Sequence, residues 1–409
     1  MHRSPLNAIR SFTQPLRNLC RQRPVLAVFE VCLRCNSDCG YCDLPLNAGR
    51  YEMTRSEIRD VFSRLYRDGL RFLFVQGGEP LLRRDLPEIL ADLRELGYRL
   101  SLITNGTRLT PELITRFAEL KIDISISLDS LDRERYRDIR GADQLRRVLA
   151  GIELLDAYPH PKYLTCIVSE VNRDDVLDVV GFARARGFIP VVGAYHWGID
   201  RYGKVTPELQ YKNDAAIDVF NNVLASDLVP RGYFRNYLKD NVRWLSGGQL
   251  ERCDAGRYSI AINASGDVAP CLALPFVGNL RESALDDVLA SMDREAIGRC
   301  SDKSSCNMLC SRVVGSNLRH PLSALMTPWA VSASGKLLSD AGAHRRRDEF
   351  AHQHDREDGY QYHRHLVPGE QIDGRIKYDA DAAGADESEH GGLTNVDVPA
   401  IDNRSKYDG

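Results

Sequence analysis

Six short apolar runs recur along the first half of the chain, with amphipathic segments of helical periodicity between them. The runs are VLAVFEV from residue 25, RFLFVQ from 71, RLSLIT from 99, IDISISLD from 122, YLTCIV from 163 and FIPVV from 188. Such near-continuous apolar runs are typical of strands buried on both faces of a parallel sheet. Strands that alternate with helices therefore predict an α/β fold, either a doubly wound sheet or a partial barrel. In both folds, ligands bind at the carboxyl ends of the strands.

Capping signals mark where several of the helices begin. Thr54-x-x-Glu57 predicts a capping box. Asp85 predicts the N-cap of a helix that runs through Leu96. Further helices are predicted from Thr110-Pro111, around Leu145–Leu155 and over Val176–Ala185.

Composition divides the chain into five segments. They are a basic amphipathic start (1–23), the α/β core (24–195), a connector with one helix (196–250), a second cysteine-bearing segment (251–331) and a tail (332–409).

Each end of the chain has two interpretations. Residues 1–23 carry arginines and no acidic residue, which is compatible with a helix on a membrane surface. Because Pro15 interrupts the apolar periodicity, we prefer a short helix that closes one end of the main domain. Residues 332–409 contain few apolar residues, so we expect a disordered tail. Its six histidines could bind metal, but we prefer a solvated tail.

Charge and cysteine content narrow the class of protein. The net charge of −3 over 409 residues gives no electrostatic case for a nucleic-acid partner. No apolar stretch approaches the ~20 residues that span a bilayer, and we find no secretory signal, so we expect a cytoplasmic protein. The eleven cysteines, an odd number in tight clusters, indicate reduced thiols that bind metal rather than a disulfide framework.

The run CNSDCGYC follows the first expected strand and contains Cys35, Cys39 and Cys42. Spacings this short require the loop to wrap one object, and thiolates select zinc or an iron–sulfur cluster. Structural zinc usually takes four ligands from two knuckles, whereas three ligands on a four-iron cluster leave one iron open to a substrate or cofactor. Cys32 could complete a set of four. Its place in extended backbone at the strand end favours a buried thiol that binds no metal.

Four further motifs follow at successive strand ends: QGGEP (76–80), ITNG (103–106), ISLDS (126–130) and YRDIRG (136–141). Together with C-x3-C-x2-C and Tyr41 before its last cysteine, this ordered set resembles the radical S-adenosylmethionine (SAM) superfamily. The resemblance implies a partial (βα)6 TIM-like barrel in which Cys35, Cys39 and Cys42 hold a [4Fe-4S] cluster. It also implies that SAM chelates the open iron through its amine and carboxylate.

The resemblance further implies which residues contact SAM. Glu79 would accept from the ammonium of SAM, Arg140 would pair with its carboxylate, and the backbone near Tyr41 would contact adenine. Ser127 and Asp129 would bind ribose hydroxyls. The full implied set is Tyr41, Gly77, Gly78, Glu79, Thr104, Asn105, Ser127, Asp129 and Arg140. Structural alternatives are a turn for the glycines, a helix cap for Asp129 and a surface ion pair for Arg140.

These motifs imply an enzyme that reductively cleaves SAM to a 5′-deoxyadenosyl radical, which abstracts a hydrogen atom from a substrate. A reductant protein of the flavodoxin or ferredoxin type would supply the electron. Two other classes stay open, namely a non-catalytic iron–sulfur electron carrier or scaffold and a zinc-stabilised binding protein. An electron carrier has no need of QGGEP, so the motifs favour the enzyme.

A second group of cysteines lies beyond the core. Cys253 and Cys271 enclose an expected hairpin, Tyr258–Asn263 and Asp267–Pro270, which turns at Ser265-Gly266. The run CSDKSSCNMLC follows from residue 300. This arrangement resembles the SPASM/twitch extension of radical SAM enzymes, which carries auxiliary iron–sulfur clusters.

The extension also departs from the pattern of that family. Ile297 stands where a full SPASM domain has a cysteine, and no cysteine follows Cys310. We therefore expect one auxiliary [4Fe-4S] cluster rather than two. The expected ligands are Cys253, Cys271 and Cys310, with Cys306 or Cys300 as the fourth. A structural zinc site built from the same residues is the alternative.

Candidate catalytic residues follow the last expected strands. Tyr195, His196 and Trp197 come after the sixth strand, where the mouth of a barrel would lie. His196 is either a catalytic group or, as is commoner beside aromatic residues, part of the packing. Cys166 in the fifth strand would donate a hydrogen atom if its thiol pointed into the barrel, and would otherwise be inert core. The resemblance implies a peptide, a protein or a sugar-like small molecule as substrate.

Overall fold

The described part of the chain is one α/β unit. The computed structural model describes residues 5–196, 204, 206–211 and 214–323, with side chains from residue 13 onward. The predicted tail at 332–409 and Trp197 lie outside the described residues. The chain divides into two compact units, Met1–His354 and Asp355–Gly409, and every described residue belongs to the first. No helix among the described residues is both long enough and apolar enough to cross a membrane.

A nine-stranded sheet forms the centre of this unit, in the order β6-β5-β4-β3-β2-β1-β7-β8-β9. Its strands are β1 (Leu26–Cys32), β2 (Phe72–Gly77), β3 (Arg99–Thr104), β4 (Asp123–Ser127), β5 (Lys162–Val168), β6 (Ile189–Ala194), β7 (Ser259–Ile262), β8 (Asp267–Ala269) and β9 (Gly278–Asn279). Strands β1 to β6 pair in parallel with their sequence neighbours. A doubly wound sheet reverses its strand order, and this sheet does not, so the predicted partial barrel is confirmed.

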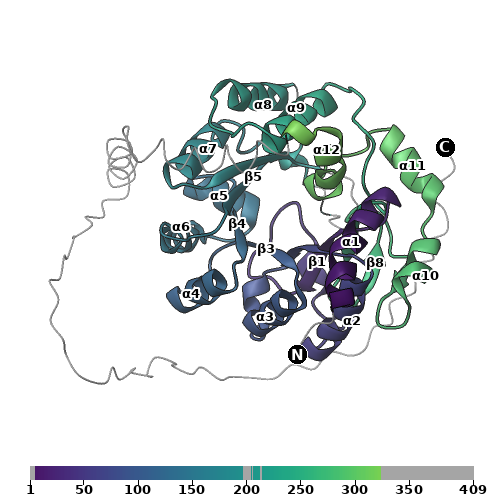
Figure 1. The fold of residues 1–409 in the computed structure, drawn as a ribbon. Coiled ribbons are helices and arrows are strands. Elements are labelled where there is room, and N and C mark those ends of the chain that lie inside the picture. Colours follow the sequence, from purple (N-terminus) through teal and green to yellow (C-terminus); the bar gives the residue numbers. More distant parts are fainter. Residues whose placement is uncertain (1–4, 197–203, 205, 212–213, 324–409) are drawn as a thin grey trace, which may run out of the picture. The chain divides into compact units, whose positions relative to one another are not determined.

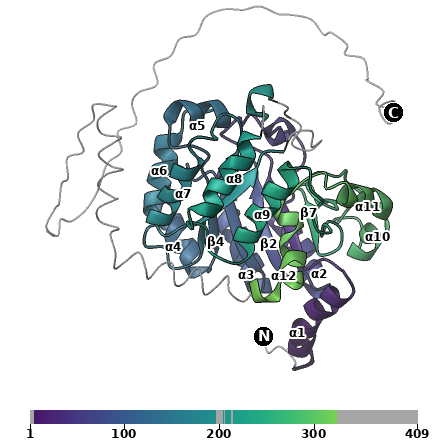
Figure 2. The ribbon, with the colours of Figure 1, turned by 90° about the horizontal axis from the view of Figure 1, so that it is seen from above.

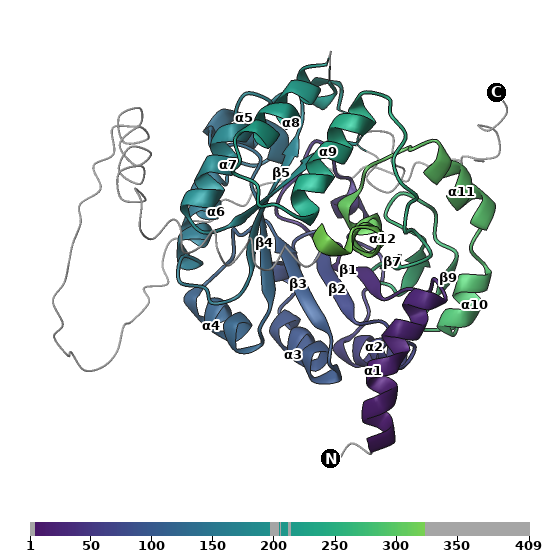
Figure 3. The ribbon, with the colours of Figure 1, turned by 45° about the horizontal axis from the view of Figure 1, so that its top comes forward.

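The helices of the described residues are α1 (Pro5–Cys20), α2 (Arg55–Arg67), α3 (Leu86–Leu96), α4 (Pro111–Glu119), α5 (Arg133–Arg140), α6 (Leu145–Leu154), α7 (Val176–Ala185), α8 (Ala215–Ala225), α9 (Tyr233–Leu245), α10 (Leu285–Ala290), α11 (Arg294–Asp302) and α12 (Val313–Arg319). Helices α2 to α7 connect the parallel strands and cover the outer face of the curved sheet (Figures 1 and 3). Helices α9 and α12 present residues to its inner face. Short 3-10 turns lie at η1 (Leu44–Asn47), η2 (Pro80–Leu82), η4 (Pro207–Leu209) and η5 (Leu309–Ser311).

Two of the predicted helix starts are confirmed and one is wrong in detail. The capping box of Thr54 and Glu57 is present at the start of α2. Thr110 accepts a hydrogen bond from the Leu113 N–H at the start of α4. Asp85 precedes α3, but its side chain does not cap the helix. Its carboxylate pairs instead with Arg83, at 2.8 Å.

The N-terminal helix α1 packs its last turn against the core. It continues through Pro15 to Cys20, so the expected interruption is wrong. A proline removes one backbone hydrogen bond and can be tolerated in an otherwise continuous helix. The Asn18 side chain donates to the backbone oxygens of Pro24 (2.9 Å) and Asp68 (2.8 Å). These bonds hold the end of α1 beside β1 and α2.

The connector between the core and the second cysteine segment contains two helices, α8 and α9, rather than the one expected. Helices α7, α8, α9 and α12 contact one another in that order (Figure 2). Helix α9 turns Tyr233, Phe234 and Tyr237 toward the inner face of the sheet.

The predicted hairpin is confirmed as β7 and β8, which pair antiparallel. The sequence did not predict that β7 also pairs with β1, in parallel, and so extends the barrel sheet. Leu26 and Val28 of β1 pack with Leu272 of the extension in one apolar cluster. The extension is therefore fixed directly beside β1, the strand from which the cysteine loop continues.

Candidate active site

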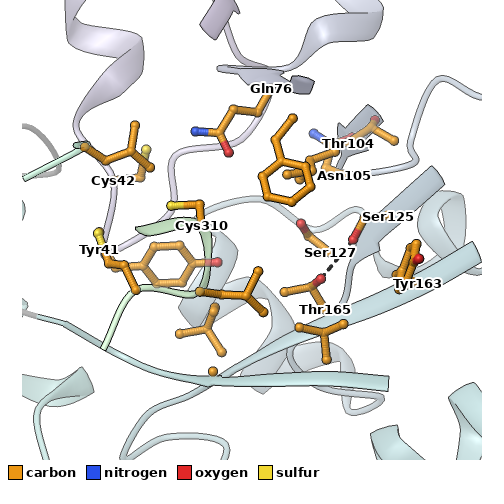
Figure 4. Close-up of a pocket in the computed structure, with 18 of the residues that line it drawn as sticks. Tyr41, Cys42, Gln76, Thr104, Asn105, Ser125, Ser127, Tyr163, Thr165 and Cys310 are labelled. Atoms are coloured by element: carbon orange, nitrogen blue, oxygen red, sulfur yellow. Dashed lines mark hydrogen bonds between the residues drawn. The ribbon is translucent and has the colours of Figure 1, made fainter. Parts of the chain in front are cut away.

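A cavity of about 520 Å³ extends along the inner face of the sheet, from the loops at the carboxyl ends of its strands to Asp123 at the start of β4 (Figure 4). Three parts of the chain line it: the cysteine loop after β1, the inner faces of β2 to β6, and α9 with the η5–α12 segment. The predicted residues on its lining are Cys35, Cys39, Tyr41, Cys42, Gly77, Gly78, Thr104, Asn105, Ser127, Arg140, Tyr195, His196 and Cys310. One cavity thus brings together most of the predicted site.

The cysteine loop is held by the end of α5. The N–H groups of Asp38 and Gly40 donate to the carbonyls of Arg140 (3.1 Å) and Ile139 (2.9 Å). These carbonyls belong to the last turn of α5, where they have no partner within the helix. Gly141 follows with φ +66°, and a Cβ there would stand 2.0 Å from the Asp38 oxygen. The YRDIRG motif therefore ends in glycine because the cysteine loop passes directly over it.

The ITNG loop holds the other side of the cysteine loop. The Asn105 side chain donates to Asn36 Oδ1 at 2.8 Å. The Asn36 carbonyl in turn accepts from Gln144 Nε2 at 2.6 Å. Asn105 also lines the cavity, so it can contact a bound molecule and support the cysteine loop at once.

The three loop thiols form a donor set that fits an iron–sulfur cluster. Burial raises the pKa of Cys35 to about 11 and that of Cys42 to about 12. Burial also raises the pKa of Cys39, and the charge of Arg140 opposes that rise. Bound iron would supply the positive charge that buried thiolates need. No three His, Cys, Asp or Glu side chains in the described part of the chain stand close enough for a single metal ion. A four-iron cluster is larger and sets its ligands further apart.

Cys32 faces away from these thiols. It is fully buried in β1 and its sulfur lies 3.3 Å from the Glu79 carbonyl oxygen. It is absent from the cavity lining. This placement supports the interpretation of Cys32 as a core thiol.

The two glycines of QGGEP allow β2 to cross close to the end of β1. A Cβ at Gly77, where φ is +148°, would stand 2.2 Å from the Cys32 oxygen. A Cβ at Gly78 would stand 2.2 Å from the Arg34 oxygen. Both glycines also line the cavity. The close approach of the neighbouring backbone therefore requires glycine at both positions, whatever molecule these glycines contact in the cavity.

Glu79 is fully buried and does not line the cavity. Its carboxylate accepts from Thr104 Oγ1 (2.5 Å), Asn105 N (2.8 Å) and Leu81 N (3.0 Å). Burial raises the pKa of this carboxyl group, and the hydrogen bonds lower it. Glu79 therefore links QGGEP to ITNG, and this placement does not support the expected contact with the SAM ammonium.

The placement of Asp129 does not support the expected contact with the ribose of SAM. It is fully buried, and one carboxylate oxygen accepts from the Ile167 N–H at 2.8 Å. The other accepts from the Tyr41 hydroxyl at 3.0 Å and lies 2.7 Å from Arg140 Nε. All of its contacts are inside the protein, and the next helix is capped by Asp132 instead. Ser127, two residues earlier, does line the cavity.

Tyr195 and His196 line the cavity wall as packed side chains. The Tyr195 ring lies 6.2 Å from that of Tyr41. The His196 ring stacks on Trp244 of α9, with centroids 4.6 Å apart, and its Nε2 accepts from the Asn307 N–H at 2.9 Å. Burial lowers the pKa of His196 to about 4, so the imidazole is neutral. These contacts favour the packing interpretation.

Cys166 does not line the cavity, so its placement does not support hydrogen-atom donation by this thiol. Alternate residues of β5 face opposite sides. Tyr163, Thr165 and Ile167 line the cavity, and Cys166 lies on the other face, 1% exposed. Its sulfur is 3.7 Å from the Asp129 carbonyl oxygen. This placement favours the alternative interpretation, a thiol of the core.

The sequence interpretation missed a polar floor of the cavity, which we define as Ser101, Asp123, Ser125 and Thr165. Ser125 and Thr165 are hydrogen-bonded at 2.9 Å (Figure 4). The Asp123 carboxylate oxygen Oδ2 lies 3.8 Å from Arg99 Nε. Barrel interiors are usually filled by branched apolar side chains. The alternation of Asp123, Ser125 and Ser127 in IDISIS was a usable signal for inward polar groups.

The cysteines of the extension lie near one another, and Cys310 among them lines the cavity. Cys253 lies close enough to raise the pKa values of Cys271, Cys306 and Cys310, and Cys306 raises that of Cys271, although burial is the larger cause. Burial raises the pKa of Cys271 and of Cys306 to about 12. Cys300 also raises the pKa values of Cys253 and Cys306. Cys306 and Cys300 thus both stay candidates for the fourth ligand.

Comparison with known families gives two matches along the chain. The family model described as "Radical SAM superfamily" matches residues 29–183. The model described as SPASM, "Iron-sulfur cluster-binding domain", matches residues 253–312.

Curated relatives are similar over part of the chain. A "Probable GTP 3',8-cyclase" of Pyrococcus abyssi is 36% identical over 152 residues, which are 36% of this chain and 49% of the relative. An "AdoMet-dependent heme synthase" of Methanosarcina barkeri is 31% identical over 179 residues, 42% of this chain and 50% of the relative. The chain thus spans about half the length of these relatives.

Solved structures share the fold over a larger part of the chain. Streptococcus suis SuiB bound to precursor peptide SuiA aligns with a TM-score of 0.57 at 17% identity, covering 74% of this chain and 73% of SuiB. The structure of anSMEcpe with AdoMet and the Kp18Cys peptide aligns with a TM-score of 0.51 at 18% identity, covering 69% and 84%. At this identity the likeness shows the fold alone.

Proposed function

Because the chain belongs to the radical SAM superfamily and carries a C-terminal SPASM iron–sulfur domain, we propose that it cleaves SAM reductively and removes a hydrogen atom from a substrate in the central cavity. One observation carries the proposal. Three cysteines of one loop and the motif residues of three strands line the same cavity.

The cofactors are those of the two families, a [4Fe-4S] cluster with SAM and an auxiliary iron–sulfur cluster. Cys35, Cys39 and Cys42 would hold the first. Cys253, Cys271 and Cys310 would hold the second, with Cys306 or Cys300 as the fourth ligand. When bound, the first cluster supplies the electron that cleaves SAM, and the resulting 5′-deoxyadenosyl radical takes the substrate hydrogen.

The side chains around the cavity suit this chemistry. Ser127 and Asn105 offer hydrogen-bonding groups beside the cysteine loop, where the polar parts of SAM would lie. Phe74, Leu272 and Met308 form an apolar wall. Such a wall keeps water and stray hydrogen donors away from a reactive species.

The test is SAM cleavage by the reconstituted protein. Under anaerobic conditions, dithionite and SAM should yield 5′-deoxyadenosine, and alanine at Cys35, Cys39 or Cys42 should abolish it. Iron in the protein without 5′-deoxyadenosine would favour a non-catalytic iron–sulfur electron carrier or scaffold instead.

For the substrate, we infer a peptide side chain. SuiB and anSMEcpe, which share the fold, have been solved with peptides bound. A cavity of about 520 Å³ that also accepts SAM leaves room for a side chain rather than for a folded domain. A sugar-like molecule is the second candidate, favoured by the polar floor.

Mass spectrometry separates the two substrates. The reconstituted enzyme is incubated with a synthetic peptide library and, separately, with a panel of sugars and aminocyclitols. We expect a peptide whose mass changes only when SAM is present. Unchanged peptides, with faster 5′-deoxyadenosine formation on a sugar or aminocyclitol, would point to the second candidate.

A further inference from the structure

Arg140 contacts the cysteine loop with its side chain as well as its backbone. Its guanidinium is buried, with the residue 6% exposed, and Nη1 lies 3.9 Å from the Cys39 sulfur in a hydrogen bond. The guanidinium carbon lies 5.6 Å from the ring centre of Tyr41, also in the loop. A buried cation therefore stands beside one of the three loop sulfurs.

Asp129 holds this cation in place. Its carboxylate lies 2.7 Å from Arg140 Nε, although the Nε–H itself is not aimed at the oxygen. The same carboxylate accepts from the Ile167 N–H and the Tyr41 hydroxyl. Because Asp129 is fully buried and has partners on both oxygens, Arg140 cannot turn away without leaving a buried charge unpaired.

We propose that Arg140 is a positioning residue for the cluster of the cysteine loop, which donates to the Cys39 sulfur and raises the reduction potential of that cluster. Hydrogen bonds and positive charge at ligating sulfurs favour the reduced state, which carries one more negative charge. This inference rests on the part of the proposed function that makes Cys39 a cluster ligand. It does not rest on the reaction.

The proposed bond to the Cys39 sulfur and the expected pairing with the SAM carboxylate are two different roles of Arg140, and they act at different stages. A bond to the Cys39 sulfur acts on the cluster before SAM arrives. A bond to the carboxylate acts only once SAM is bound. The reduction potential without SAM and the affinity for SAM therefore report on different roles.

The experiment is a redox titration of the reconstituted full chain without SAM, followed by electron paramagnetic resonance. Arg140→Gln removes the charge and most of the donors, and Arg140→Lys keeps the charge but not the planar fork. Arg137→Gln is the matched control, because Arg137 lies one turn earlier on α5 and is exposed. SAM is added last, to identify by its spectral shift which signal belongs to the cysteine loop.

We expect Arg140→Gln to lower the potential of the loop cluster, Arg140→Lys to lower it less, and Arg137→Gln to leave it unchanged. The auxiliary cluster should keep its potential in all three variants. If Arg140→Gln holds no cluster, a lowered potential in Arg140→Lys supports the proposal and an unchanged one overturns it.

An unchanged potential in Arg140→Gln overturns the proposal, and weaker SAM binding alongside it would assign Arg140 to the carboxylate. A lowered potential in a protein that never cleaves SAM would support this inference while ruling out the proposed reaction.

Discussion

Gly141 is the residue on which the position of the cysteine loop depends most directly. Its φ is +66°, and a Cβ there would stand only 2.0 Å from the Asp38 oxygen, which leaves no room for a side chain. We expect Gly141→Ala to displace the loop and to lose the loop cluster, measured as iron per chain after reconstitution. The left-handed backbone alone costs about 1–2 kcal/mol for alanine, which should lower the free energy of unfolding of the apo protein.

The control for this variant is Gly181→Ala in α7. Gly181 has open space around its Cβ position, and alanine is the better helix former by about 1 kcal/mol. This variant should hold full iron and unfold no more easily than the parent. Full iron in Gly141→Ala as well would show that the loop does not need its contact with the end of α5.

Cys32 and Cys39 make a second pair at the residue scale. Both thiols are buried, but only Cys39 lines the cavity. Cys32→Ala should keep the loop cluster and its SAM-dependent spectral shift, with a loss of about 1 kcal/mol in unfolding free energy from the small void. Cys39→Ala should lose the cluster. Loss of the cluster in Cys32→Ala would return Cys32 to the ligand set.

At the residue scale, the sequence predicted those features that depend on the spacing of residues within one loop. The loop cysteines are set by local spacing, so they line one cavity as expected. The pairing of Asp129 with Arg140 and the outward face of Cys166 depend on how β4, β5 and α5 meet. Strand β5 has apolar residues on both faces, so its sequence does not show which face is inward.

At the scale of elements, His196 joins the end of β6 to the auxiliary-cluster segment through the Asn307 N–H and the Trp244 ring. Burial lowers the pKa of His196 to about 4, below the ~6.5 of an unfolded chain. The unfolded state therefore takes up a proton first as the pH falls. Stability from this residue is full above pH ~6.5 and is lost between there and pH ~4, by up to about 3 kcal/mol.

Urea unfolding of the apo protein tests this linkage. The free energy of unfolding of the wild type should fall between pH 7 and pH 4.5 by more than that of His196→Gln, whose amide can still accept from Asn307. Other acidic groups titrate in both proteins, so the difference isolates His196. Parallel loss in the two proteins would mean that His196 is already charged, or solvated, in the fold.

Elements were predictable where periodicity is strong, and their pairing was not. The runs that predicted β1 to β6 and the helices α6 and α7 agree with the structure because each carries its own apolar pattern. The pairing of β7 with β1 joins residues far apart in the chain through backbone hydrogen bonds. The apolar pattern of a strand shows which of its faces is buried but not which distant strand it pairs with. The hairpin was therefore predictable, and its place in the sheet was not.

At the scale of the whole described unit, the consequence of that pairing is one cavity lined by the three loop thiols and by Cys310 of the extension. The extension lies beside β1, so η5 brings Cys310 to the cavity that the cysteine loop also lines. Spacing in the sequence predicted both groups but gave no reason to place them around one space. A cluster bound by the extension cysteines would stand close enough to the cavity to accept an electron from a substrate radical there, which is part of our proposal.

Removing the auxiliary cluster should therefore separate SAM cleavage from the full reaction. Cys271 lies on the side of the extension and takes no part in the cysteine loop. We expect Cys271→Ala to lower the iron content from about eight to about four per chain and to keep 5′-deoxyadenosine formation with dithionite, while product formation falls to background. Matched loss of both activities would mean that the extension is needed to build the loop site, since β7 and β1 share the sheet. Full product formation without the second cluster would limit the role of the extension to closing the cavity.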